Sequence, residues 1–86
     1  MPEISRFYGI VIKMYFADHE PAHFHVEYAE SQAIINIDTL ALIAGRLPPR
    51  ALGLVAEWAA LHQAELREAW QRAKNLESTG KIEPLQ

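Results

Sequence analysis

The first half of the chain alternates apolar and polar positions in the manner of β-strands. Between Phe7 and Phe16 every second residue, starting at Tyr8, is apolar. Successive side chains of a strand point to opposite faces. This pattern predicts one strand whose core face carries Tyr8, Ile10, Ile12, Met14 and Phe16, and whose outer face carries Phe7, Gly9, Val11, Lys13 and Tyr15.

Two further strands are expected after a turn at Asp18–Pro21. From His23 to Glu30 the alternation directs Phe24, Val26 and Tyr28 inward and His23, His25 and Glu27 outward. From Gln32 to Asp38 it directs Ala33, Ile35 and Ile37 inward and Gln32, Ile34, Asn36 and Asp38 outward. An apolar run over Thr39–Ala44, ended by Gly45, adds at most a fourth strand. The connections are too short for parallel crossovers, so we expect an antiparallel meander.

The second half of the chain changes to helical periodicity. Pro48-Pro49 suits the first turn of a helix, and the pattern continues to about Asn75. Apolar residues at helical spacing form one stripe, which holds Ala51, Leu54, Val55, Trp58, Leu61, Leu66, Ala69, Ala73 and Leu76. An unbroken helix of this length measures about 40 Å, whereas a compact domain of this size has a radius of gyration near ~12 Å. We expect either a bend near Gly53 or packing of the second half, with Trp70, against a homodimer partner.

These patterns together predict an α+β fold. Residues 1–86 are expected to form one domain, with an antiparallel sheet of three to four strands in meander order. One long C-terminal helix is expected to pack across one face of the sheet. The other face then carries the polar residues of the strands.

Composition narrows the class of protein. Half of the 86 residues are hydrophobic and 22% are charged, which is typical of a globular domain rather than a disordered chain. The chain has no cysteine, which excludes disulfides and thiolate metal sites. The N-terminus lacks a signal-peptide pattern, and no apolar stretch approaches the roughly 20 residues of a membrane helix. We therefore expect a cytoplasmic protein without membrane contact.

The charge balance argues against general nucleic-acid binding. The net charge is −3, and the eight Lys and Arg residues form no basic run. Proteins that bind nucleic acid without regard to sequence gain most of their affinity by neutralising phosphates with such residues. A role as a transcriptional regulator is therefore the least favoured function.

Three of the four histidines lie within one short stretch, Asp18–Val26. His23 and His25 are two apart on a strand, so their Cα atoms lie about 7 Å apart on one face. They are able to converge on one metal ion if His19, Asp18 or a neighbouring strand supplies a third ligand. The simpler interpretation is that they are exposed histidines bonded to the Asp18 turn. We prefer it, and expect neither a metal nor a cofactor.

The same histidines are candidates for acid–base catalysis. Imidazole changes its charge near neutral pH, which suits proton transfer. The candidate catalytic residues are His19, His23 and His25. Lys13 lies on the same outer face and would supply the positive charge beside the phosphate group of an RNA substrate.

His62 is expected to have a structural role. It lies within the apolar stripe of the helix, and Glu65 follows at the i+3 position, where a hydrogen bond is sterically allowed. A buried carboxylate is costly unless it is paired. Glu65 is therefore expected to bond to His62 or Arg72 or to lie at an opening, and we prefer a His62–Glu65 pair at the rim of the core. If the helix covers the core face, this pair lies on the opposite side of the sheet from His23 and His25.

Several blocks of the sequence resemble a family of short bacterial proteins catalogued as domain of unknown function 4160. These blocks are Met1–Ile10, Met14–Phe16, Asp18–Pro21, His23–Val26, Leu47–Ala51, Glu57-Trp58 and Lys81–Leu85. The resemblance implies a compact bacterial cytoplasmic protein, encoded beside another small protein in an arrangement like a toxin–antitoxin pair. It implies no particular catalytic residue.

The preferred function is an interaction component of such a toxin–antitoxin-like pair. The partner is expected to be the protein encoded nearby, bound through Lys13, Tyr15, Glu27, Asn36 and Asp38 on the outer face together with the two strand histidines. Burial of both histidines beneath the helix would contradict this hypothesis. The alternative is a small ribonuclease, with RNA as the partner, or a metal-dependent hydrolase using His19, His23 and His25. Whether the protein is an enzyme stays open.

Overall fold

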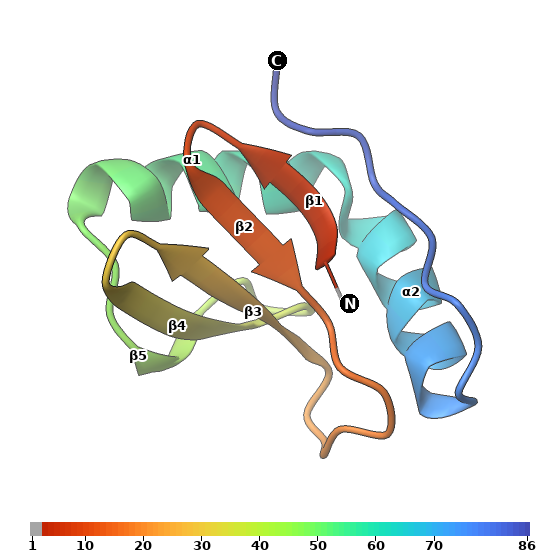
Figure 1. Ribbon diagram of the computed structural model, residues 1–86. Helices are drawn as coiled ribbons and strands as arrows, with labels where there is room; N and C mark the ends of the chain where they lie inside the picture. Colours follow the sequence, from red (N-terminus) through yellow and green to blue (C-terminus); the bar gives the residue numbers. More distant parts are fainter. Residues whose placement is uncertain (1–2) are drawn as a thin grey trace.

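A five-stranded antiparallel sheet with two helices makes up the protein (Figure 1). The structure is a computed structural model that describes residues 3–86; Met1 and Pro2, which begin the stretch interpreted as lacking a signal peptide, lie outside the described residues. The elements are β1 (Glu3–Phe7), β2 (Ile10–Lys13), β3 (His23–Tyr28), β4 (Ser31–Asn36), β5 (Leu42–Gly45), α1 (Pro49–Leu61) and α2 (Gln63–Lys74). The strands lie in sequence order. The predicted α+β class and meander are confirmed, but the sheet has one strand more than the upper prediction.

The predicted strand Phe7–Phe16 is wrong, because a tight turn divides it into β1 and β2. Phe7 pairs with Ile10 across a two-residue turn in which Tyr8 has φ 51° and Gly9 has φ 80°. Positive φ at both positions gives a turn whose twist matches that of the flanking strands. The turn reverses the expected positions of two residues, so Phe7 is buried and Tyr8 is 60% exposed, whereas Ile10, Ile12 and Met14 are buried as predicted. Phe16, predicted to be buried, is also exposed because β2 ends at Lys13.

The expected faces of β3 and β4 are largely confirmed. Phe24 pairs with Ile35 and Val26 with Ala33, and all four side chains are buried. The predicted apolar run beyond them becomes β5, which includes Gly45 instead of ending before it. Gly45 has φ 77°, and a Cβ atom there would lie 2.1 Å from the carbonyl oxygen of Gln32. Only glycine fits this close approach of the two strands.

The predicted single long helix is wrong, because the helix breaks at His62. α1 ends at Leu61, and α2 begins at Gln63 after His62 leaves helical geometry. The expected bend site, Gly53, lies inside α1 instead. A straight helix of about 40 Å would exceed the longest dimension of the molecule, which is 33 Å. Leu61, predicted to be buried, is exposed at the break.

Both helices contribute to one hydrophobic core with the sheet. The fully buried ring of Trp58 in α1 lies 5.4 Å from that of Phe7 and 5.9 Å from that of Phe24, between ring centroids. Trp70 in α2 is 3% exposed within the single chain. The surface expected from a homodimer partner is therefore supplied by the chain itself. Among residues 3–86 we find no helix that is both long and apolar enough to cross a membrane.

The two edges of the sheet differ. The segment after α2 runs back beside β1 (Figure 1), where the backbone N–H of Ile82 donates to the carbonyl of Ile4 at 2.8 Å. The indole N–H of Trp58 also donates to the carbonyl of Glu83 at 2.8 Å. At the other edge, all four residues of β5 are exposed. We call the sheet face that carries His25 and Glu27, away from the helices, the outer face.

A candidate site at the β2–β3 connection

The connection between β2 and β3 folds against α2. The backbone N–H of Ala17 donates to the carbonyl of Ala73 at 3.1 Å. Lys74 contacts the carboxylate of Glu20 at 2.9 Å. These contacts hold the connection so that the half-buried Asp18, between them, faces the first residues of β3.

Two histidines converge on one oxygen atom of Asp18. Nε2 of His23 lies 2.9 Å from Oδ2 of Asp18, and Nε2 of His25 lies 3.2 Å from the same oxygen. The other carboxylate oxygen accepts the backbone N–H of His19 at 2.8 Å. The predicted bonding between the strand histidines and the Asp18 turn is confirmed. The turn expected at Asp18–Pro21 therefore contributes the Asp18 carboxylate to the candidate site.

The two histidines differ in their exposure. The prediction that His23 is accessible is wrong: it is 8% exposed, and its ring centroid lies 5.1 Å from that of Trp70. The cause is α2, which lies beside the start of β3 and covers its first residue. His25, two residues further along, has a side chain that is 26% exposed and an edge contact with the ring of Tyr15 at 4.6 Å. His23 is therefore the buried member of the cluster, and His25 is the member that solvent reaches.

The second ring nitrogen of His23 also faces an oxygen atom. Its Nδ1 lies 2.7 Å from the backbone carbonyl oxygen of Pro21. A carbonyl only accepts hydrogen bonds, so Nδ1 carries a proton. The ring is therefore held between the carbonyl of Pro21 and the carboxylate of Asp18.

The carboxylate of Asp18 is held in its charged form. Burial raises the pKa of Asp18. The hydrogen bonds from the backbone of His19 and from the rings of His25 and His23 lower this pKa, and together they outweigh the effect of burial. The net result is a pKa below the ordinary value of 3.8. The cluster therefore presents a negative charge between two imidazole rings at neutral pH.

The remaining two histidines lie outside this cluster. Among residues 3–86, the one group of three side chains with metal-ligating atoms within 4.8 Å of one another is Asp18, His23 and His25. His19 is exposed and contributes its backbone N–H to the turn. His62 contacts Glu65 at 2.6 Å, so the predicted pairing of these two side chains is confirmed. His62 also packs on Trp58, at 5.7 Å between ring centroids.

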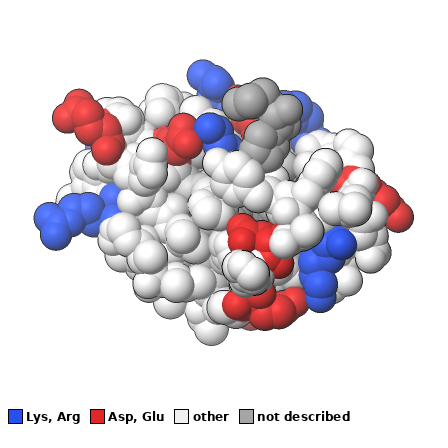
Figure 2. All heavy atoms as spheres, turned by 60° about the horizontal axis from the view of Figure 1, so that its bottom comes forward, with Lys and Arg blue, Asp and Glu red and all other residues white. Residues whose placement is uncertain are grey.

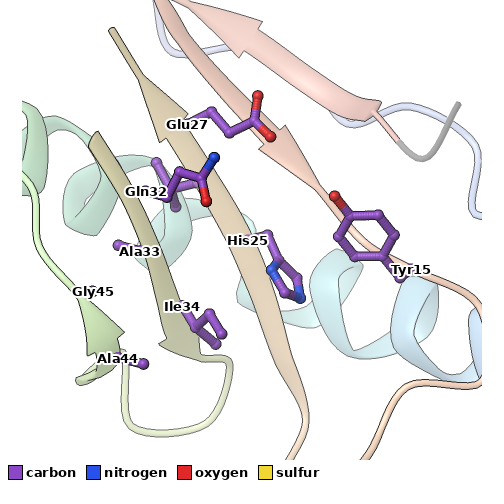
Figure 3. A pocket seen from close by; sticks show the side chains of 9 residues that line it. Tyr15, His25, Glu27, Gln32, Ala33, Ile34, Ala44 and Gly45 are labelled. Atoms are coloured by element: carbon purple, nitrogen blue, oxygen red, sulfur yellow. The ribbon is translucent and has the colours of Figure 1, made fainter. Parts of the chain in front are cut away.

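A shallow groove on the outer face begins beside His25. It is lined by Tyr15, His25, Val26, Glu27, Gln32, Ala33, Ile34, Ala44 and Gly45. Figure 3 shows Tyr15 on the segment after β2, with His25 and Glu27 on the neighbouring strand, and the helices lie behind the sheet. Of the predicted partner-binding residues, Tyr15 and Glu27 line this groove. Lys13 lies at its margin, where its ammonium group contacts Glu27 at 2.9 Å.

The two other predicted partner-binding residues have different environments. The side-chain oxygen of Asn36 accepts the backbone N–H groups of Asp38 and Thr39, at 2.7 Å and 2.9 Å. It therefore shapes the turn that leads to β5. The carboxylate of Asp38 accepts a hydrogen bond from Arg67 of α2 at 2.9 Å. The structure does not bring these two residues to the groove, whereas Gln32 and Ile34, which alternate on the same outer face, do line it.

Comparison with known proteins identifies the family but no individual relative. The family described as domain of unknown function (DUF4160) matches residues 9–71, a range that includes the Asp18 turn, both strand histidines and most of α2. The chain belongs to this family. No curated protein and no solved structure matches the chain significantly.

Proposed function

We propose that this protein is the interaction component of a toxin–antitoxin-like pair in the bacterial cytoplasm. It binds the small protein encoded beside it through the outer face of its sheet. The main support for the proposal is that the helices cover only one face of the sheet. The other face is left with a groove that a partner is able to occupy. The paired gene arrangement implied by the family resemblance supports a protein as the occupant.

The chemistry of the groove suits a protein surface. Tyr15 is 39% exposed, and Ile34 contributes an aliphatic side chain in the groove's lining. The ion pair of Lys13 and Glu27 lies at the margin. An apolar centre with an aromatic residue and a polar margin is typical of protein–protein interfaces. In the view of Figure 2 the surface is largely uncharged, and its basic side chains are scattered beside acidic ones. Nucleic acid is therefore the less suitable partner.

The free edge of the sheet continues this surface. Ala44 and Gly45 of β5 line the groove, and their neighbours Leu42 and Ile43 are 43% and 46% exposed. This edge carries no Lys, Pro or acidic residue, which are the devices that usually prevent strand pairing. An extended segment of the partner is able to pair with β5 and place its side chains in the groove.

Binding of the purified neighbouring protein tests this proposal. Ile43→Lys at the sheet edge and Tyr15→Ala in the groove are each expected to weaken binding at least about tenfold, as loss of a central apolar contact does. Leu61→Lys and Leu76→Lys are matched controls, because these residues are more exposed, at 68% and 67%, but Leu61 ends α1 and Leu76 lies in the segment after α2. Equal affinity for all four variants in calorimetry would exclude the outer face.

A hydrolase is the second candidate, and the position of His25 favours it. This histidine is half-exposed, lies against Asp18 and lines the groove, so a bound substrate could reach its ring. Lys13 is paired with Glu27, however, and is not free to contact a phosphate. Growth arrest on induced expression that His25→Gln relieves, with folding retained, would support this candidate. Arrest that persists in this variant would remove it.

A further inference from the structure

The ligand atoms of Asp18, His23 and His25 lie at separations close to those of a metal site. A carboxylate with two imidazoles is a frequent ligand set for divalent transition metals such as zinc. Ligand atoms that surround a tetrahedral zinc ion at 2.0–2.1 Å are about 3.3 Å apart. Here Oδ2 of Asp18 lies 2.9 Å and 3.2 Å from the two Nε2 atoms. These two separations differ from the tetrahedral value by a few tenths of an ångström, and all three ligand atoms lie within 4.8 Å of one another.

Both ring nitrogens of His23 face oxygen atoms that accept hydrogen bonds, so its Nε2 atom needs a proton or a metal ion. Because Nδ1 donates to the carbonyl of Pro21, the neutral ring presents a lone pair at Nε2. That lone pair faces the ionised Asp18 at 2.9 Å. Two acceptors at this distance repel each other unless a proton or a metal ion lies between them. His23 is 8% exposed, so solvent does little to relieve the repulsion.

The surroundings hold each ligand in position. Metal-binding histidines usually donate their other ring N–H to a carbonyl or carboxylate, which fixes the tautomer and the ring orientation. The carbonyl of Pro21 has this role for His23. Trp70 packs against the same ring, and the N–H of His19 fixes the free oxygen of Asp18. This support comes from two separate parts of the chain, the β2–β3 connection and α2, unlike that of a chance surface cluster.

We propose that Asp18 Oδ2, His23 Nε2 and His25 Nε2 bind one divalent transition-metal ion, with zinc as the best-fitting candidate. The sequence alone led us to expect no metal, because His-x-His offers only two ligands and Asp18 was one of several candidates for a third. His25 reaches the groove beside Tyr15 (Figure 3), so the fourth position is accessible to water or to an anionic group in the groove. The proposal goes beyond partner binding and does not depend on it.

Calorimetric titration of the chelator-treated protein with zinc tests this proposal. The expected result is one ion per chain, with absorption bands of a nitrogen- and oxygen-ligated tetrahedral site when cobalt(II) replaces zinc. Asp18→Asn and His25→Gln are each expected to weaken affinity by at least about 100-fold, since loss of even an outer-shell partner costs 10–100-fold. His19→Gln and His62→Gln are the controls and are expected to keep full affinity.

The variants separate metal binding from folding. His25 is half-exposed, so His25→Gln retains the fold even if Asp18→Asn lowers stability. Circular dichroism of each variant reports folding before the titration. Failure of the unmodified protein to bind zinc or cobalt would overturn the proposal. So would unchanged affinity in a folded His25→Gln variant, or equal loss in His19→Gln.

Discussion

Histidine contacts carboxylate at two sites in this molecule, and the two sites differ in how many side chains they bring together. His62 lies at the break between the helices and Glu65 in the first turn of α2; they approach to 2.6 Å, and the side chain of Glu65 is 51% exposed. Asp18 contacts two histidines through one oxygen, and the side chain of Asp18 is 22% exposed. The first is a single ring with a single carboxylate. The second gathers three ligand groups around one point.

The difference shows that the partner of the second ring nitrogen determines whether a neutral histidine satisfies the contact with a carboxylate. For His62, one nitrogen donates to Glu65, and this pair is satisfied by a neutral ring. For His23, both nitrogens face oxygen atoms, because Pro21 accepts from Nδ1 while Asp18 lies at Nε2. A neutral ring cannot donate to both. The contact between His23 and Asp18 therefore requires a proton or a metal ion at Nε2, whereas the His62–Glu65 pair is satisfied by a neutral ring.

Removal of Trp70 is expected to have the largest effect on the cluster. Trp70→Ala should lower the free energy of unfolding by about 3–5 kcal/mol, as truncation of a buried aromatic side chain does. It should also weaken zinc binding, because the ring of His23 loses the surface against which it packs. Urea denaturation and zinc titration measure the two effects. Trp58→Ala is the control, because it removes the corresponding contact with His62 at similar cost to stability; zinc affinity of its folded fraction should be unchanged.

Zinc itself is expected to stabilise the protein. At a free concentration one hundred times the Kd, a ligand that binds only the folded state adds about 2.7 kcal/mol to the free energy of unfolding. Thermal or urea denaturation with and without zinc measures this gain. It should vanish in Asp18→Asn and persist in Glu65→Gln. The same gain in both variants would place the ion elsewhere.

The two carboxylates should contribute differently to stability without metal. When a proton occupies Nε2 of His23 in place of the metal, Asp18→Ala removes three hydrogen bonds and leaves the buried His23 without one partner, a cost of about 1–3 kcal/mol. Glu65→Ala removes one contact at i+3 on an exposed surface, which is worth no more than about 0.5 kcal/mol. Urea denaturation of the two variants compares them directly. Equal losses would show that the organisation of the two sites differs less than their geometry suggests.

The smallest effect is expected from the ion pair that ties the β2–β3 connection to α2. The hydrogen bond from Lys74 lowers the pKa of Glu20 below its ordinary value of 4.5. A lowered pKa in the folded state contributes stability above the ordinary pKa, and this contribution is lost as the pH falls through 4.5 toward the folded value. Lys74→Met should therefore make unfolding slightly less dependent on pH in this range. Both side chains are exposed, so the difference is small and decreases with added salt.

Local spacing was enough to predict one of the two histidine sites. The His62–Glu65 pair follows from the i+3 spacing, even though His62 lies at the break between the helices, and alternation correctly assigned Phe24 and Val26 to the core. These features depend on neighbours within a few residues. The apolar stripe did not reveal the break at His62, because neither glycine nor proline marks it. Similarly, Tyr8 in a tight turn resembles a strand residue in the sequence.

The sequence was enough to predict where the Asp18 cluster lies, but not which side chains it brings together. The spacing of His23 and His25 correctly predicted that they share a face, and Asp18 was one of several candidates for a third ligand. Its selection depends on how the β2–β3 connection folds back against α2. The burial of His23 depends on Trp70, which lies 47 residues further along the chain. Contacts of this range leave no periodic signal in a single sequence.

Long-range proton–nitrogen NMR of the four histidine rings, with and without zinc, tests the central claim most directly. The tautomer of each ring and the nitrogen that binds metal are read from the same spectra. The predicted result is a proton on Nδ1 of His23 throughout, with zinc-induced shifts at Nε2 of His23 and His25 and none at His19 or His62. A proton absent from Nδ1 of His23, or zinc-induced shifts at His19 or His62 instead, would contradict it.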